Sequence, residues 1–231
     1  MFNPTAARSW VCSAAVSLVA FLALTVWVQQ TNGPTGLDTA VMSFVLAART
    51  PLLTALASTA TVLGSVPAVI IVAVVAAVVL LRRTERLLLP LTLLIVVAET
   101  ASVVFLTKAG LGRQRPPIDW LIGTPSSDAS YPSGHTTNGT VVYVLAALFL
   151  CSTITRHWVR RLLLVAAVAV SVSIGLSRVY LGHHWTTDVL GAWLLATASC
   201  SVAAFVVCRL SAKTYSAGQH QPETGREIVS R

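Results

Sequence analysis

The polar stretch SRVYLGHHWTTD, residues 177–188, lies between two long hydrophobic runs of the chain. This placement indicates that the chain leaves and re-enters a membrane at these residues. Asp188 follows His184 by four residues, so one helical turn brings both side chains to the same face. His183 points off that face, and the spacing therefore favours His184 as the partner of the carboxylate.

The pairing of a histidine with a carboxylate has a chemical consequence. The carboxylate of Asp188 can accept a hydrogen bond from one ring nitrogen of His184 and leave the lone pair of the other nitrogen free. A histidine held in this way can act as a nucleophile and not only as a proton carrier. Arg178 is within reach, and its planar, permanently charged guanidinium suits phosphate oxygens.

Two further polar stretches precede this one in the chain. Residues 108–116, KAGLGRQRP, carry three cations, and residues 131–135, YPSGH, follow shortly after. Lys108, Arg115 and Arg178 can surround a phosphoryl group without a metal ion, because phosphoryl transfer depends mainly on positioning and electrostatic stabilisation. We therefore expect neither a metal nor a cofactor.

Ser133 and Gly134 come directly before a predicted membrane span, where the first amides of a helix point outward without partners. These amides and the helix dipole favour an anion, and Gly134 lets the backbone approach it closely. Ser133 could equally be a helix N-cap, and the two roles are compatible. His135 follows at once and is expected to act as the general acid.

Together the three stretches read Lys-x6-Arg-Pro, Pro-Ser-Gly-His and Ser-Arg-x5-His-x3-Asp, in this order. The pattern resembles the type 2 phosphatidic acid phosphatase family, within the lipid phosphatase and vanadium haloperoxidase superfamily. The resemblance implies that His184 is a nucleophile that forms a phosphohistidine, with Asp188 as its partner and His135 as the acid. It also implies a set of phosphate-binding residues, which are Lys108, Arg115, Ser133, Gly134 and Arg178. Arg113 is additional to the pattern, and we expect it to contact either phosphate or a lipid headgroup.

The composition is typical of a membrane protein. Of the 231 residues, 55% are hydrophobic and only 10% are charged, which excludes an ordinary soluble domain. The net charge of +8 is better explained by basic cytoplasmic loops than by a nucleic-acid partner, and we expect no nucleic acid. The four cysteines lie within or beside apolar segments, so we expect packing residues and no disulfides or zinc site.

The hydrophobic pattern predicts an all-α bundle of six transmembrane helices within residues 1–208. A cleavable signal peptide is the alternative for the first segment, but its length favours a retained span. Two short amphipathic helices, residues 37–48 and 51–63, are expected to lie in the membrane interface between the first two spans. Residues 209–231 are expected to form a disordered, polar cytoplasmic tail. The predicted spans are residues 11–28, 66–81, 87–107, 136–153, 159–174 and 189–207.

The arginines predict the orientation in the membrane. With six spans, four basic segments fall on one side of the membrane. They are Arg8, the group Arg82, Arg83 and Arg86, the group Arg156, Arg160 and Arg161, and the tail. The positive-inside rule places this side, with both termini, in the cytoplasm. The three motif stretches are then expected on the extracytoplasmic face.

These observations predict an integral membrane lipid phosphatase whose partners are the bilayer and a lipid phosphate or diphosphate. The resemblance implies polyprenyl diphosphate, phosphatidylglycerophosphate or phosphatidate as substrates. The alternative function is a phosphotransferase that passes the phosphate to another lipid or a sugar. A non-catalytic lipid-binding or transport protein is a weaker alternative, because every catalytic position of the motifs is filled.

Overall fold

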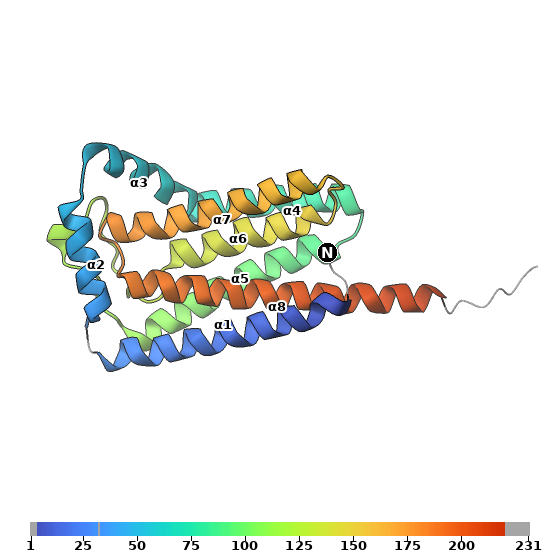
Figure 1. The fold of residues 1–231 in the computed structure, drawn as a ribbon, viewed down its shortest axis with the longest axis horizontal. Coiled ribbons are helices and arrows are strands. Elements are labelled where there is room, and N and C mark those ends of the chain that lie inside the picture. The colour runs from blue at the N-terminus through green and yellow to red at the C-terminus, as the bar shows by residue number, and fades with distance from the viewer. Residues whose placement is uncertain (1–3, 32, 220–231) are drawn as a thin grey trace, which may run out of the picture.

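The structure is a computed structural model that describes residues 4–31 and 33–219. Within these residues every regular element is a helix, and six helices are long and apolar enough to cross a membrane. The predicted all-α bundle of six spans is therefore confirmed (Figure 1). The six are α1 (Pro4–Gln30), α4 (Val66–Thr84), α5 (Leu88–Leu111), α6 (Gly134–Cys151), α7 (His157–Tyr180) and α8 (Thr186–Gln219).

Two short helices connect α1 to α4, as the sequence predicted. Helix α2 (Gly36–Ala47) lies across one end of the bundle, and α3 (Pro51–Leu63) leads from it to α4 (Figure 1). Proline at the first position of α3 and the Thr50 hydroxyl, which accepts a hydrogen bond from the Leu53 amide, define where this helix begins. A single 3-10 turn, η1 (Ile118–Trp120), lies in the long connection between α5 and α6.

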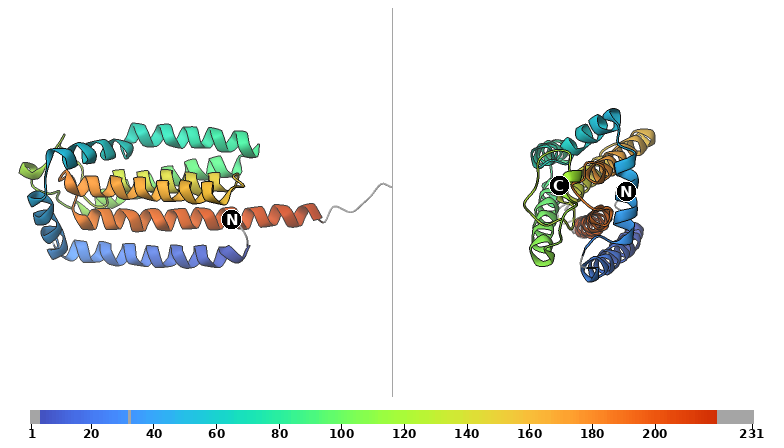
Figure 2. Two further views of the ribbon diagram at one scale, coloured as in Figure 1. Left: turned by 45° about the horizontal axis from the view of Figure 1, so that its top comes forward. Right: turned by 90° about the vertical axis from the view of Figure 1, so that its left-hand side faces the viewer.

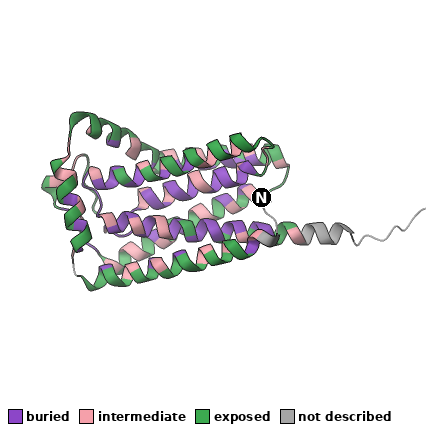
Figure 3. Cartoon of the chain, in the orientation of Figure 1, coloured by how far each residue is buried: buried purple, intermediate pink, exposed green. Residues whose placement is uncertain are grey.

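Helices α6 and α8 occupy the middle of the bundle, and α1, α4, α5 and α7 surround them (Figure 2). Apolar side chains of the surrounding helices, such as Val16, Ile71 and Val165, are exposed, whereas α6 is buried over most of its length (Figure 3). A soluble bundle would cover its outer surface with polar side chains, whereas the outer surface here is apolar and suits contact with lipid. Because lipid is as apolar as leucine, the helices are held together by close packing rather than by the hydrophobic effect.

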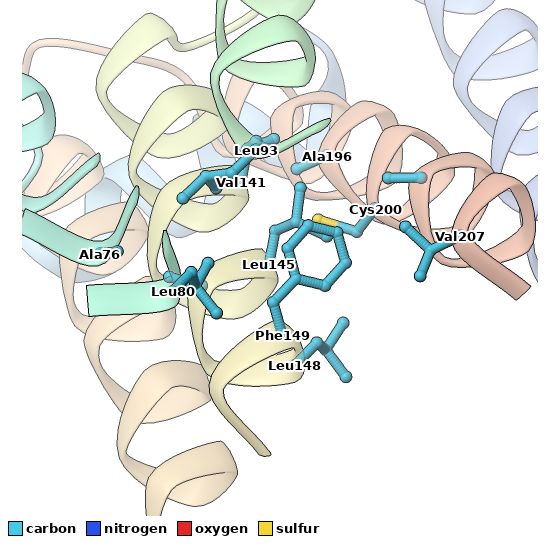
Figure 4. Close-up of a cluster of buried hydrophobic side chains, with 12 residues drawn as sticks. Ala76, Leu80, Leu93, Val141, Leu145, Leu148, Phe149, Ala196, Cys200 and Val207 are labelled. Carbon is cyan, nitrogen blue, oxygen red and sulfur yellow. The ribbon is translucent and has the colours of Figure 1, made fainter. Parts of the chain in front are cut away.

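The largest packed cluster lies between α4, α5, α6 and α8. Leu80, Leu93, Leu145 and Phe149 are fully buried there, against small residues of α8 such as Ala196 (Figure 4). The cluster occupies the half of the bundle away from α2. A smaller apolar cluster, made of Met42, Val179, Trp185 and Val189, lies at the α2 end beside the polar residues.

Glycines allow two close approaches near the α2 end. A Cβ atom at Gly175 of α7 would come within 2.5 Å of Trp193 and 2.8 Å of Val189, both on α8. A Cβ atom at Gly191 would come within 2.5 Å of the Tyr131 hydroxyl. The missing side chains therefore let α7 and the segment before α6 approach α8 closely, which brings the three motif stretches together.

The end of α8 differs from the prediction. The helix continues to Gln219, whereas the sequence predicted a disordered tail from residue 209. The apolar part of α8 ends at Ala212. A helix that is already nucleated can continue through residues with good helix propensity, such as Leu210, Ala212 and Lys213, after it has left the apolar layer. Residues 220–231 of the predicted tail lie outside the described residues.

Candidate functional site

The three motif stretches meet at the α2 end of the bundle, although they are far apart in the sequence. Backbone hydrogen bonds join them to one another: the Ser133 amide donates to the Asp188 carbonyl at 3.2 Å, and the Ser130 amide donates to the Arg113 carbonyl at 2.8 Å. A third bond, from the Ile122 amide to the Leu181 carbonyl, is 2.9 Å long. The long connection between α5 and α6 is thus fastened across the ends of α7 and α8.

His184 and Asp188 form the buried pair that their spacing predicted. Nδ1 of His184 lies 3.3 Å from Oδ2 of Asp188, and the two side chains are 2% and 0% exposed. The same carboxylate oxygen accepts hydrogen bonds from the Trp185 amide at 2.9 Å and from the Ser130 hydroxyl. Three donors around one oxygen hold the carboxylate in place against the ring.

The other ring nitrogen of His184 faces Arg115. Nη1 of Arg115 lies 3.2 Å from Nε2 of His184 and also donates to the His183 carbonyl at 2.7 Å. A guanidinium can only donate, so Nε2 must carry the lone pair and Nδ1 the proton. Burial, followed by the charges of Arg115, Arg178 and Lys108, lowers the pKa of His184 well below its ordinary value. The lone pair of Nε2 is therefore directed toward the cations.

His183 is placed differently from its neighbour. Its amide donates to the Arg178 carbonyl at 3.0 Å, and its ring lies beside Gly123, where an added Cβ would come within 3.4 Å of Nε2. Burial, with the charges of Arg178 and Arg115, lowers the pKa of His183 to about 4. The structure thus brings His184, and not His183, onto the carboxylate of Asp188.

The three cations predicted to bind phosphate converge on this histidine from separate elements. Lys108 is in the last turn of α5, Arg115 follows that helix, and Arg178 is in the last turn of α7. Arg178 donates to the Thr61 hydroxyl at 2.7 Å, and its buried Nε has no hydrogen-bond partner in the described part of the chain. Arg178 is therefore an integral part of α7, although the sequence placed the end of that span at residue 174.

Asp128, which the sequence did not indicate, pairs with two of these cations. Its carboxylate lies 2.6 Å from Nζ of Lys108 and 2.7 Å from Nη2 of Arg115, and its side chain is 51% exposed. Partial burial alone would raise the pKa of Asp128, but the hydrogen bonds from Lys108 and Ser126 hold this pKa well below its usual range. An ionised carboxylate thus rests on the predicted anion site.

The start of α6, where the sequence predicted free amides, has no side-chain cap. Ser133 is the N-cap residue, but its side chain makes no capping hydrogen bond and instead accepts one from the Thr136 hydroxyl at 3.0 Å. The first amides of the helix, which begins at Gly134, are therefore not satisfied by a side-chain cap. His135 lies in this first turn, half-buried and within electrostatic range of His184.

Arg113, for which the sequence predicted a contact with phosphate or a lipid headgroup, pairs with two carboxylates. Its side chain is 6% exposed, and the guanidinium bridges two fully buried carboxylates, Asp38 and Asp188. Nη2 lies 2.8 Å from Oδ2 of Asp38, and Nη1 donates to Oδ1 of Asp188 and to the Thr187 hydroxyl. Both ends of its planar fork are occupied by carboxylates, so Arg113 is a structural neighbour of the nucleophile candidate.

Asp38 lies on α2, for which the sequence predicted an amphipathic helix in the membrane interface. The periodicity of α2 puts it on the polar side of an interfacial helix, yet it is 0% exposed. Hydrogen bonds from Thr35, Arg113 and Thr187 compensate for its burial. Only the pairing with distant residues makes this burial possible, and no local signal in α2 indicates it.

Known proteins resemble the chain both in sequence and in fold. The family model of the PAP2 superfamily matches residues 87–211. Phosphatidylglycerophosphatase B of Bacillus subtilis (strain 168) is 34% identical over 108 residues, which are 46% of this chain and 51% of that protein. A putative undecaprenyl-diphosphatase, YbjG of Escherichia coli (strain K12), is 39% identical over 90 residues, 39% of this chain and 41% of that protein. The matched region thus spans about half the length of these relatives or less.

A solved structure shares the fold over most of both chains. It is the first transmembrane PAP2-type phosphatidylglycerolphosphate phosphatase structure from Bacillus subtilis, with a TM-score of 0.71 and 24% sequence identity, covering 87% of this chain and 96% of that one. The family model covers more than half of the chain and includes all three motif stretches. The chain is therefore a multi-pass membrane protein that belongs to the PAP2 superfamily.

Proposed function

We propose that the protein is a lipid phosphatase that hydrolyses a membrane lipid phosphate or diphosphate through a phosphohistidine at His184. One observation carries the proposal: a buried histidine has Nδ1 on the carboxylate of Asp188 and the lone pair of Nε2 toward Arg115. Membership of the PAP2 superfamily supports it. The two relatives named for phosphatidylglycerophosphate and undecaprenyl diphosphate support these lipids, together with phosphatidate, as the substrate class.

The first step transfers the phosphoryl group to the enzyme. The lone pair on Nε2 of His184 attacks phosphorus, the bond from phosphorus to the leaving oxygen breaks, and His135 gives that oxygen its proton. The charge on the equatorial oxygens is balanced by Lys108, Arg115 and Arg178, together with the first amides of α6. Asp188 balances the positive charge that develops on the ring.

The second step returns the enzyme to its first state. His135, now neutral, takes a proton from water while the water oxygen attacks phosphorus and the bond from phosphorus to Nε2 breaks. Inorganic phosphate leaves, and His184 recovers its lone pair. No metal is needed, since side-chain cations and amides supply the positive charge.

Substrate binding must displace Asp128. Its carboxylate pairs with Lys108 and Arg115, so a phosphate group competes with it for both cations. Asp128 then keeps the cations apart and oriented before substrate arrives, and its exposure lets it move into water afterwards.

The active site is proposed to face the extracytoplasmic side. Two groups of arginines lie at the end of the bundle opposite to α2 (Figure 1). The first is Arg82 and Arg83 in the last turn of α4 with Arg86 just after it, and the second is Arg156, Arg160 and Arg161 at the start of α7. The positive-inside rule places that end in the cytoplasm, with the end of α8.

The purified protein should release inorganic phosphate from lipid phosphates without an added acceptor and in excess chelator. The assay compares polyprenyl, glycerol and sphingoid phosphates in detergent or vesicles. Release that needs a lipid or sugar acceptor would identify a phosphotransferase instead. Activity that is lost in chelator and restored by magnesium or zinc would contradict the metal-free mechanism.

The two adjacent histidines should differ sharply in their importance. His184→Ala removes the nucleophile and should lower the initial rate by about 1,000-fold or more. His183→Ala leaves the pair with Asp188 intact and should retain most of the activity. Initial rates are compared at equal amounts of monodisperse protein. An inactive His183 variant beside an active His184 variant would overturn the assignment of the nucleophile.

Asp128→Asn should tighten inhibition by vanadate, which can adopt the geometry of a transferring phosphoryl group. The change removes the carboxylate that competes for Lys108 and Arg115, and we expect a decrease of about fivefold in the inhibition constant, since a partly exposed ion pair is worth up to about 1 kcal/mol. Asp119→Asn, in η1, is the matched control, because its exposed carboxylate has no ion pair in the described residues. Equal inhibition of both variants and the wild type would show that Asp128 does not compete with the anion.

Labelling with an impermeant thiol reagent tests the orientation in intact cells. Ser127→Cys, at the active-site end, should react, whereas Arg83→Cys, at the other end, should react only after lysis; both positions are exposed. Cys12, the exposed native thiol, is replaced by serine in both variants. The opposite pattern would place the site in the cytoplasm.

A further inference from the structure

Asp38 makes more contacts than a helix cap requires. It belongs to a capping box at the start of α2, where its carboxylate accepts a hydrogen bond from the Thr35 amide at 2.9 Å. The same carboxylate also accepts from the Thr187 amide at 2.8 Å, from the Thr187 hydroxyl at 2.9–3.0 Å and from Nη2 of Arg113 at 2.8 Å. These last partners belong to α8 and to the segment after α5, so the carboxylate reaches well beyond its own helix.

Arg113 connects Asp38 to the carboxylate behind the nucleophile. One terminal nitrogen of its guanidinium lies on Asp38, and the other donates to Oδ1 of Asp188. Oδ2 of Asp188 in turn lies 3.3 Å from Nδ1 of His184. The four side chains form one buried chain, whose order is Asp38, Arg113, Asp188 and His184. A planar fork between two carboxylates fixes the direction as well as the distance of each.

The charges of Asp38, Arg113 and Asp188 do not cancel. Arg113 alone would neutralise Asp188, and a neutral pair offers little attraction to a positive ring. Asp38 shares the same cation, so the three groups together keep one negative charge beside His184. In a buried site this charge acts over a short distance and with little screening.

The other charged groups around His184 are positive or titratable. Lys108 approaches it from α5, Arg115 from the following segment, Arg178 from α7 and His135 from α6. Asp128 is the remaining carboxylate near these cations, and it pairs with Lys108 and Arg115. When a phosphate takes the place of Asp128, the negative charge behind the ring comes from Asp188, with Asp38 offsetting Arg113.

We propose that Asp38 is a positioning residue for the nucleophile: through Arg113 it holds Asp188 against His184 and preserves the negative charge that stabilises the phosphorylated ring. The proposal rests on the proposed function, because it gives Asp38 a role only if His184 carries the phosphoryl group. Asp38 touches no substrate, so it should govern kcat and leave KM almost unchanged.

The decisive variant is Asp38→Asn, which keeps the shape of the side chain and removes its charge. We expect kcat to fall by about 10- to 100-fold. This range is taken by analogy from metal-binding histidines that lose the hydrogen-bond partner of their other ring nitrogen. The acid limb of the kcat/KM profile should also move to lower pH. Loss of a negative charge disfavours the protonated ring, lowers the pKa of His184 and so shifts this limb downward. Asp38→Glu keeps the charge and should retain the acid limb of the wild type.

Two reference variants make the result interpretable. Asp119→Asn removes an exposed carboxylate at the same end of the protein and should leave both kcat and the pH profile unchanged. Arg113→Lys keeps the positive charge but cannot bridge both carboxylates, so kcat should fall while KM stays the same. This variant tests the connection even if Asp38→Asn does not fold.

The outcomes separate the two proposals. A kcat of the wild-type size in Asp38→Asn or in Arg113→Lys would overturn the role of Asp38. The proposal would also fail if Asp38→Asn lowered kcat and Tm but left the acid limb at its wild-type pH. That result would mean that Asp38 only anchors α2 in the fold. If His184→Ala itself keeps its activity, the proposed function fails, whatever the Asp38 variants show.

Discussion

The bridge made by Arg113 is the interaction on which the polar end of the bundle depends. It ties α2 to α8 through two carboxylates that are fully buried, and it does so from the segment between α5 and α6. Each partner would be costly to bury alone, because an unpaired charge loses its hydration without compensation. Removal of any member leaves the others uncompensated, so the three elements must assemble together. The closed end of the bundle and the orientation of Asp188 therefore have the same cause.

A second constraint comes from three cations gathered at one end of an apolar bundle. Lys108, Arg115 and Arg178 repel one another, and partial burial strengthens that repulsion. The protein meets it with Asp128, which lies on a connection and not on a helix, and which is half exposed. An anion held by a rigid helix would block the site, whereas one on a surface segment can leave it. The buried carboxylates and the exposed one thus differ: the first set the geometry, and in the proposed function the second balances the charge until an anion arrives.

Much of the fold could be predicted from the sequence, because membrane spans and helical periodicity are local properties. The six hydrophobic runs, the two short helices and the pairing of His184 with Asp188 all follow from spacing alone. The ends of the helices could not be predicted so well. Arg178 lies inside α7, and the charged segment after residue 208 continues α8. Capping and packing determine where a helix ends, and these ends need not coincide with the last apolar residue.

The misplaced residues share one physical reason. Asp38 and Arg113 have ordinary local surroundings in the sequence, and each is buried only because the other is there. Periodicity assigns a polar residue to the water-facing side of a helix, and this assignment fails when a distant residue of opposite charge lies on the buried side. The one available signal was an arginine outside the motif pattern, on the side that the positive-inside rule predicts to be extracytoplasmic. Such a cation needs a partner of opposite charge. The carboxylate of Asp38 on α2 is such a partner, because it is buried beside Arg113.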